Sequence, residues 1–300
     1  MTMARGLRDG GTGGTADAVF SVTESDLPLA ALRPGTALAI ICGTEGPSYR
    51  PCGAGMAITA EGRVTGHLSA GCIDRDVAHH AQMALRDGRT RQLRYGAGSP
   101  FRDLELPCGG GLDILIEPAP DTAQLAQARR QLAQRCPAEL RCGQVRLHIL
   151  PELRFLVFGN GPEARIFAAT AHSAGYPTEL LSADAETLAG LDGLRTQEIG
   201  LGWPAELAVD ARTSISMFFH DHDRELALLP MALGSSAFYV GAMGSARAAD
   251  KRAHLLREQA LAPELIARLS RPFGVVPSTR NPRSLAISVL ADILSRTGHS

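Results

Sequence analysis

The feature that most constrains the fold is a glycine-rich turn at residues 159–164, between a predicted strand and a predicted helix. Residues 154–158 form a short apolar run that is typical of a buried strand, and an amphipathic pattern continues from the turn to Gly175. The turn has the pattern G-x-G-x-x-A, with Gly159 and Gly161 as its glycines. Between a strand and a helix, this pattern indicates a Rossmann-like fold, whose turn directs backbone N–H groups and a helix N-terminus at a phosphate.

The same region gives little support to NAD as the ligand. In an NAD site, the next strand ends in an acid that binds the ribose hydroxyls. Here the next predicted strand, residues 178–182, ends in Ser182, and Asp184 follows two positions later. The sequence therefore favours the fold, and NAD(P) binding stays an open alternative without its usual acid.

Two other predicted strands place polar residues at the same edge of the sheet. One strand ends in Gly244, and Ser245 is expected to be the N-cap of a helix that runs to about residue 259. Arg247 in its first turn suits either a bound anion or a solvated surface. His220 and Asp221 follow the other strand, where a metal-binding pair is one interpretation and a hydrogen-bonded structural histidine is the one we favour.

In the first half of the chain, residues 66–74 predict a strand that turns through small residues into a helix. Ser69 or Gly71 is expected to begin this helix, and Gly88 is its expected C-cap. Cys72 would then lie in the first turn, where the helix dipole lowers the pKa of a thiol. A small cysteine buried between two tight turns is the alternative.

A second glycine-rich turn follows another cysteine, Cys108, and leads into a predicted strand at residues 112–116. Gly109 and Gly110 allow a backbone to approach a ligand closely, although a turn that only needs positive φ angles would explain them equally well. A glycine- and proline-rich loop before Gly55 precedes a predicted hairpin that turns at residues 60–62.

The length of 300 residues suits two domains, each with its own core. Residues 1–26 are polar and glycine-rich and are expected to form a mobile leader. The first domain is expected over residues 27–150, with a connecting helix near residues 121–136, and the second over residues 151–300.

Composition excludes several classes of function. A net charge of −1 predicts no general attraction to nucleic acid or to an anionic membrane, and 5% aromatic residues leave few rings for base stacking. The six cysteines show no C-x-x-C pair, and no secretory signal or membrane-spanning apolar run is recognisable. We therefore expect a cytoplasmic protein with reduced thiols.

Together these segments resemble the XdhC/CoxI family of xanthine dehydrogenase accessory proteins, from about Ala37 to Leu294. The resemblance rests on residues 53–56, 66–74 and 108–110 in the first domain, and on the Gly159 turn, residues 219–222, residues 241–245 with Arg247, and residues 281–288 in the second. It implies an α/β fold, in which an N-terminal mixed α/β domain of the XdhC type precedes a C-terminal Rossmann-like domain with a doubly wound parallel sheet.

The resemblance also implies a function. Members of this family bind molybdenum cofactor, support its sulfuration and deliver it to a molybdenum hydroxylase of the xanthine dehydrogenase type, as maturation factors rather than catalysts. The implied partners are that hydroxylase, a cysteine desulfurase as sulfur donor, and a second copy of the chain in a homodimer. Two departures from the family pattern stand out: the loop at residues 46–52, and Ser182 in place of the ribose-binding acid.

On this hypothesis, the cofactor contacts are glycines, thiols and polar residues of the turns described above. They are Gly55, Ser69, Gly71, Cys72, Asp74, Cys108, Gly109, Gly110, Gly159, Gly161, His220, Asp221, Gly244, Ser245 and Arg247. Cys72 and Cys108 are the expected contacts to molybdenum, because thiols suit a metal that already carries sulfur ligands. We expect these two thiols to lie close together.

Two alternatives from other functional classes stay open. One is an NAD(P)-dependent oxidoreductase with residues 27–150 as its substrate domain. The other is a thiol enzyme with Cys72 or Cys108 as nucleophile, for which His67, His79 and His80 are the nearest candidate bases to Cys72 in the sequence.

Overall fold

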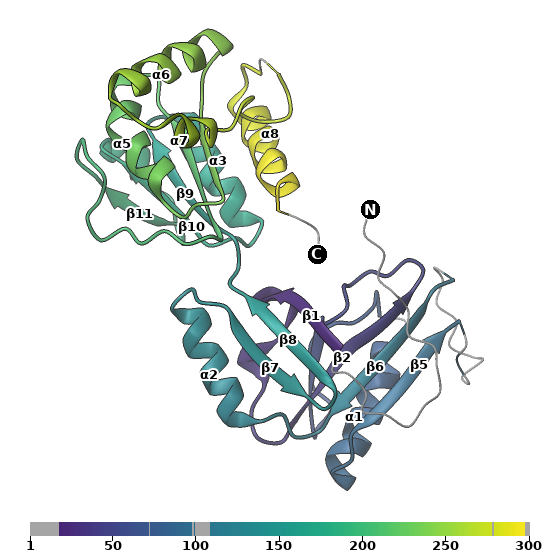
Figure 1. The fold of residues 1–300 in the computed structure, drawn as a ribbon. Helices are drawn as coiled ribbons and strands as arrows, with labels where there is room; N and C mark the ends of the chain where they lie inside the picture. The colour runs from purple at the N-terminus through teal and green to yellow at the C-terminus, as the bar shows by residue number, and fades with distance from the viewer. Residues whose placement is uncertain (1–17, 72, 98, 100–108, 278, 298–300) are drawn as a thin grey trace. The chain divides into compact units, whose positions relative to one another are not determined.

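The computed structural model describes residues 18–71, 73–97, 99, 109–277 and 279–297 (Figure 1). The chain divides into two compact units, residues 1–151 and 152–300. No helix in the described part of the chain has the length and apolar character to cross a membrane.

Unit 1 is built on a five-stranded antiparallel sheet with the order β4-β3-β2-β6-β5. The strands are β2 (Thr36–Glu45), β3 (Gly55–Thr59), β4 (Val64–Gly66), β5 (Arg91–Gly96) and β6 (Gly111–Glu117). Helix α1 (Asp74–Asp87) covers one face, where Val77 and Ala81 pack with Ile41 and Ile58. The expected hairpin is confirmed, because β3 pairs with β4 across residues 60–63.

The other face of this sheet packs against a three-stranded sheet with the order β1-β8-β7. Its strands are β1 (Ala18–Thr23), β7 (Ala138–Cys142) and β8 (Val145–Leu150), and β1 runs parallel to β8. Helix α2 (Thr122–Ala133) begins at Asp121, whose carboxylate accepts hydrogen bonds from the backbone N–H groups of residues 123 and 124. This is the expected connecting helix.

The expectation of a leader extending to residue 26 is wrong for its last nine residues. Residues 18–23 form β1, and residues 24–26 and 29–31 form the 3-10 turns η1 (Glu24–Asp26) and η2 (Leu29–Ala31). The cause is a short alternation of Phe20 and Val22 with polar residues, which buries Val22 against β8. Residues 1–17 lie outside the described part of the chain.

The expected start of α1 is also wrong. The helix begins at Asp74 with Ile73 as its N-cap, so neither Ser69 nor Gly71 opens it. The loop before it is closed instead by the Asp74 carboxylate, which accepts hydrogen bonds from Ser69. The C-cap prediction is confirmed: Gly88 has φ +69° in the left-handed region.

Unit 2 contains a five-stranded parallel sheet with the order β11-β10-β9-β12-β13. The strands are β9 (Arg154–Gly159), β10 (Thr178–Ser182), β11 (Arg195–Glu198), β12 (Thr213–Phe218) and β13 (Tyr239–Ala242). The helices are α3 (Pro162–Ser173), α4 (Ala185–Leu188), α5 (His222–Gly234), α6 (Ala246–Glu258), α7 (Pro263–Ala267) and α8 (Pro282–Ser295).

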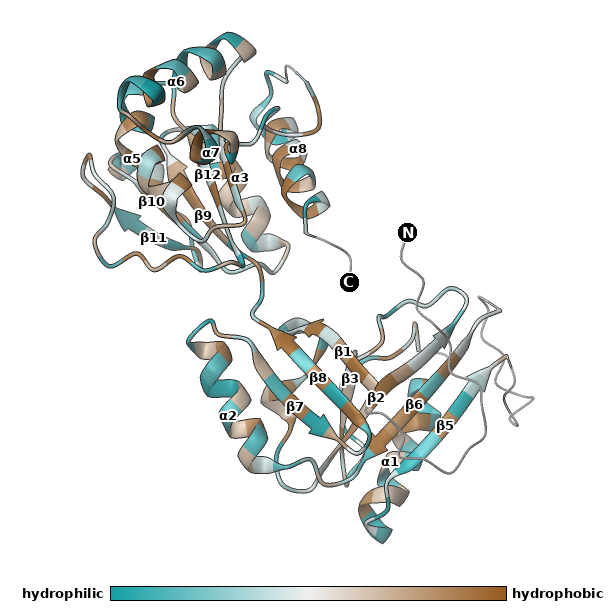
Figure 2. Ribbon diagram, in the orientation of Figure 1, coloured by the Kyte–Doolittle hydropathy of each residue, from teal (hydrophilic) through white to brown (hydrophobic). Residues whose placement is uncertain are grey.

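Helices cover both faces of this sheet. On β9, Phe155 and Val157 pack with α3 and α8, whereas Leu156 and Phe158 pack with α5, α6 and α7. Figure 2 shows β9 as an apolar strand within the sheet, in contrast to the polar strand β11. The predicted doubly wound, Rossmann-like fold is therefore confirmed.

A buried ion pair connects two helices of this unit. The Arg252 guanidinium of α6 donates to the Glu225 carboxylate of α5 over 2.7 Å, and to the Met243 carbonyl oxygen over 2.7 Å. The Glu225 side chain is 0% exposed and that of Arg252 3% exposed. Because both charges are out of water, each depends on the other.

We therefore predict a large cost when one partner is removed. Arg252→Met leaves the Glu225 carboxylate buried without its cation and should lower the free energy of unfolding by about 3–5 kcal/mol. Lys251→Met, an exposed change at the neighbouring position, should cost less than about 0.5 kcal/mol. Urea denaturation followed by circular dichroism measures both, and equal stabilities would contradict the prediction.

A double variant distinguishes the interaction energy of the ion pair from the packing contribution of each side chain. Replacing Glu225 as well, as Glu225→Met with Arg252→Met, removes both charges and should recover part of the loss. If the double variant loses as much free energy of unfolding as the two single variants lose together, the two side chains act independently.

Candidate functional site

Three connections of unit 1 begin at strand ends on the same side of the five-stranded sheet. The loop at residues 46–54 joins the end of β2 to the start of β3, and the loop at 67–73 follows the end of β4. The segment at 97–110 joins the end of β5 to the start of β6. Because neighbouring strands are antiparallel, these ends all lie at the same edge of the sheet.

The Asp74 carboxylate organises the loop at residues 67–73. Its Oδ1 accepts hydrogen bonds from the Ser69 N–H over 3.0 Å and from the Ser69 hydroxyl over 2.9 Å. The Gly71 N–H in turn donates to the Ser69 Oγ over 3.0 Å. Two expected contact residues, Ser69 and Asp74, are thus bonded to each other. Ser69 and Asp74 therefore fix the shape of the loop. Gly71 has φ +99° and open space where a Cβ would lie, so its backbone is accessible at the loop surface.

Gly55 has a packing role. It is buried inside β3, and a Cβ atom there would lie 2.7 Å from Leu27 Cδ2 and 3.1 Å from Leu38 Cδ1. A larger residue would therefore force apart the core beneath the loops. The geometry explains this glycine without any ligand.

The second glycine turn combines two roles. Gly109 has φ +68° and nothing within 4 Å of the place where a Cβ would lie, so this position needs positive φ and faces open space. The Gly110 carbonyl accepts from the Ala97 N–H over 3.1 Å, directly beside the paired ends of β5 and β6. Cys108 itself, like Cys72, lies outside the described residues, so the expected proximity of these two thiols stays a prediction.

A charged cluster at this edge was not anticipated. Arg94 of β5 donates to Asp113 of β6 over 2.9 Å, to Glu45 at the end of β2, and to the Ala97 carbonyl over 2.8 Å. The only signal for it in the sequence is Asp113, an acid that interrupts the apolar run of β6. The cluster ties three strand ends together beside the loops.

The described cysteines differ sharply in their surroundings. Burial, with the nearby Asp113 carboxylate, raises the pKa of Cys42 to about 11. Burial, with Glu117, raises the pKa of Cys142 to about 12. Cys136 is exposed, and Cys52 is half-buried with its thiol 3.8 Å from the Thr44 hydroxyl.

In unit 2, the predicted turns follow the carboxyl ends of parallel strands. Gly159 ends β9, His220 lies two residues beyond β12, and Gly244 lies two residues beyond β13. Since β9, β12 and β13 are adjacent and parallel, the three turns lie at the same end of the sheet, and the strand order reverses between β9 and β12. A Cβ on Gly159 would lie 2.4 Å from the Phe218 carbonyl oxygen, so this glycine allows β9 and β12 to approach closely.

The polar groups of the Gly159 turn are bonded within the protein. The Gly161 N–H donates to the Thr187 Oγ1 over 2.8 Å, and the Thr187 hydroxyl donates to the Asp184 carboxylate over 2.5 Å. The Ser182 hydroxyl donates to the Asn160 side-chain oxygen over 2.9 Å. One of the backbone donors that a Rossmann turn offers to a phosphate is therefore already in use, as are Ser182 and Asp184.

His220 and Asp221 do not form a pair. His220 is 74% exposed, with its Nε2 3.5 Å from the Glu163 carboxylate in the first turn of α3. The Asp221 side chain caps α5 and accepts from the Asp223 N–H over 3.0 Å. Among the residues that the structure describes, no group of His, Cys, Asp and Glu has a metal-binding arrangement. The favoured interpretation of His220 as a structural histidine is wrong, because the ring lies mostly in solvent.

The turn before α6 keeps its expected form. Ser245 is the N-cap, and its hydroxyl oxygen accepts from the Ala248 N–H over 3.2 Å. Arg247 is exposed in the first turn, with no acid in that turn and no ion-pair partner among the described residues. By contrast, α3 and α5 carry acids in their first turns. The start of α6 is thus the most favourable of the three for an external anion.

The chain matches two family models in separate regions. Residues 30–96 match the model described as the XdhC and CoxI family. Residues 155–293 match the model described as the XdhC Rossmann domain. The first match covers most of the five-stranded sheet of unit 1 and the second covers most of unit 2.

Two curated proteins of Escherichia coli K12 are similar along most of the chain. The molybdenum cofactor insertion chaperone PaoD is 29% identical over 283 residues, which cover 87% of this chain and 83% of PaoD. The uncharacterized protein YqeB is 24% identical over 269 residues, which cover 86% of this chain and 43% of YqeB.

A solved structure shares the fold. A crystal structure described as a xanthine dehydrogenase from Bacillus halodurans matches 89% of this chain and 93% of its own, with a TM-score of 0.70 and 20% identity. At this identity the likeness concerns the fold.

The internal bonds of the Gly159 turn predict weak nicotinamide binding. Ser182 offers one neutral hydroxyl where a carboxylate would accept two charge-assisted hydrogen bonds, and this hydroxyl already bonds Asn160. We expect NAD and NADP to bind weakly and with affinities within about tenfold of each other, a difference of about 1.4 kcal/mol. Calorimetric titration with each cofactor measures this. Tight NAD binding with strong rejection of NADP would contradict the prediction.

The raised thiol pKa values predict an order of alkylation. Thiolate is the reactive form, so raising the pKa lowers the reactive fraction at neutral pH. Cys42 and Cys142 should therefore react with iodoacetamide much more slowly than exposed Cys136, and their rates should rise roughly tenfold per pH unit toward their pKa values. Peptide mass spectrometry of the folded chain gives the rates, with urea-unfolded chain as control. Equal rates for Cys142 and Cys136 in the folded chain would contradict the prediction.

Proposed function

The chain belongs to the XdhC and CoxI family, and on this premise we propose that it is an accessory protein that binds molybdenum cofactor. It stabilises the cofactor, supports its sulfuration and delivers it to a molybdenum hydroxylase of the xanthine dehydrogenase type. The cofactor is the cargo of this protein, which acts as a carrier in the maturation of another enzyme.

One observation carries the proposal. The chain is a distant homologue of the insertion chaperone PaoD, and the similarity runs through both units. A shared Rossmann domain would give a match to unit 2 alone and would say little about function. Because the similarity to PaoD extends over both units, it supports a shared role of the two proteins.

The chemistry of the cargo agrees with the edges described above. Molybdenum cofactor carries a phosphate and a metal bound by dithiolene sulfurs. The start of α6, with Arg247 and no acid in its first turn, offers an anion-binding group in unit 2. In unit 1, Gly71 and Gly109 present open backbone in the loops that contain Cys72 and Cys108.

The proposal includes the partners that delivery requires. The client is the hydroxylase, a cysteine desulfurase supplies the sulfur atom, and two copies of the chain form a homodimer in the cytoplasm. A nicotinamide-dependent oxidoreductase is disfavoured, because the Gly161 N–H, Ser182 and Asp184 are bonded within the protein.

The direct test is chemical analysis of the purified chain. Protein from a host that makes molybdenum cofactor should contain molybdenum and pterin in near-equal amounts to the chain, and protein from a strain that cannot make the cofactor should contain neither. Bound nicotinamide in place of molybdenum and pterin would overturn the proposal. Transfer is then measured by adding the loaded protein to a cofactor-free hydroxylase.

Cysteine variants test the proposed metal contacts. Cys72→Ser and Cys108→Ser should each lower the hydroxylase activity obtained in this transfer assay at least tenfold, because each removes a soft ligand for the metal. Cys136→Ser is the matched control, since Cys136 is exposed. Cys142 is unsuitable as a control, because its burial makes a hydroxyl costly there. Full transfer by all of the variants would assign both thiols a purely structural role.

A further inference from the structure

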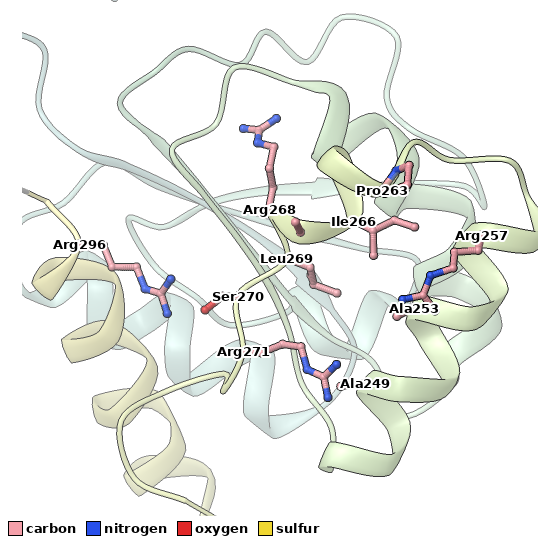
Figure 3. A pocket seen from close by; sticks show the side chains of 11 residues that line it. Ala249, Ala253, Arg257, Pro263, Ile266, Arg268, Leu269, Ser270, Arg271 and Arg296 are labelled. Atoms are coloured by element: carbon pink, nitrogen blue, oxygen red, sulfur yellow. The ribbon is translucent and has the colours of Figure 1, made fainter.

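A cavity of about 430 Å³ lies in unit 2 beside α6 (Figure 3). Its walls come from α6, α7 and residues 268–271, with Arg296 after α8 at one side. Residues 268–271 run along the sheet, where the Ser270 N–H donates to the Val240 carbonyl of β13 over 2.8 Å. The cavity is formed by different residues from the Gly159 and Ser245 turns.

The lining combines an apolar wall with a basic rim. Ala249 and Ala253, one turn apart on α6, leave space opposite Ile266 and Leu269. The volume falls in the range of small-molecule sites, and apolar walls with a few polar groups are typical of them. A small ring suits this wall.

Four arginines and no acid line the cavity: Arg257, Arg268, Arg271 and Arg296. Two of them have acid partners outside the lining. Arg271 bonds Asp250 over 2.9 Å, and Arg296 pairs with Asp292 over 3.0 Å.

The other two arginines have no acid partner among the described residues. Arg268 donates to the carbonyl oxygens of residues 233, 235 and 237, and Figure 3 shows its guanidinium directed away from the other three. Arg257 is exposed at the last turn of α6, and its side chain makes no hydrogen bond or ion pair to another described residue. Two positive charges therefore lack an acid, and the Arg257 guanidinium keeps all of its donors free for a ligand.

Arg271 offers a second guanidinium that can bind an anionic ligand. It extends toward α6, and its bond to Asp250 uses one guanidinium nitrogen. Asp250 is 72% exposed, so water screens this pair and the remaining donors of Arg271 stay available. Arginine forks suit phosphate oxygens, which accept parallel hydrogen bonds.

We propose that this cavity binds a small ring compound with a terminal phosphate, the phosphate at Arg257 and Arg271 and the ring against Ala249 and Ala253. A phosphate monoester carries a charge of about −1.5 to −2 at neutral pH, which suits the Arg257 guanidinium together with the Arg271 guanidinium, whose pair with Asp250 is screened by water. This site is separate from the proposed cofactor contacts and does not rest on the proposed function.

Phenyl phosphate is the probe, titrated into the full chain by calorimetry. It should bind more tightly than inorganic phosphate, because the ring adds apolar contact, and more tightly than benzoate, because the carboxylate carries less charge. Arg257→Gln should weaken phenyl phosphate binding at least fivefold. Ala249→Leu, which fills part of the cavity, should weaken phenyl phosphate more than inorganic phosphate.

Lys251→Gln is the matched control. It removes one positive charge from α6 at an exposed position outside the lining, and it should leave the affinity unchanged within twofold. Equal losses for Lys251→Gln and Arg257→Gln would mean that general charge attraction holds the probe, and would overturn the site. Benzoate binding as tight as that of phenyl phosphate would overturn the phosphate assignment. Circular dichroism of each variant confirms its fold.

Discussion

The position of every candidate residue depends on the direction of the strand before it. In unit 2, the strands of the sheet are parallel and helices cover both of its faces, so the carboxyl ends of all strands lie at the same end of the sheet. Turns that are far apart in the sequence therefore lie at that same end. Gly159 shows how tight this arrangement is, because the Phe218 carbonyl of the next strand leaves no room for a Cβ. In unit 1, antiparallel pairing has the equivalent effect for three loops, since β2, β4 and β5 end where β3 and β6 begin.

A turn of the Rossmann type can keep its shape and lose its usual ligand. The glycines of the Gly159 turn serve backbone geometry and strand packing, and these demands come from the fold whether or not a dinucleotide binds. Near the short helix after β10, the Thr187 hydroxyl accepts the hydrogen bond of the Gly161 N–H, a donor that a phosphate would otherwise use. The same hydroxyl donates to the Asp184 carboxylate, which is therefore occupied within the protein. The motif therefore carries more information about architecture than about chemistry, which explains why the fold could be predicted and the nucleotide could not.

The strongly patterned elements could be predicted from the sequence, and the weakly patterned ones could not. The β9 strand is a continuous apolar run and the start of α6 carries a serine cap, so both were anticipated. Strand β11 consists of exposed polar residues paired only with β10, which leaves no hydrophobic signal. The start of α1 was misplaced because Asp74 closes the loop backward onto Ser69, an arrangement that the usual capping residues do not reveal. The arginine-lined cavity has no motif, because its walls meet only when α6, α7 and the segment after α7 pack together.

The local distribution of charge within unit 2 shows which helix starts can bind an anion, and the net charge of the chain does not. The chain as a whole is nearly neutral, at −1. At the carboxyl edge of the sheet, Glu163 lies in the first turn of α3 and acids lie in the first turn of α5, so the positive ends of those helices are already compensated by the protein. Helix α6 has no acid in its first turn, and its last turn contributes Arg257 to the cavity. Among α3, α5 and α6, the start of α6 is therefore the one most suited to contact an anionic ligand, and Arg257 in the last turn of the same helix supplies a guanidinium to the cavity.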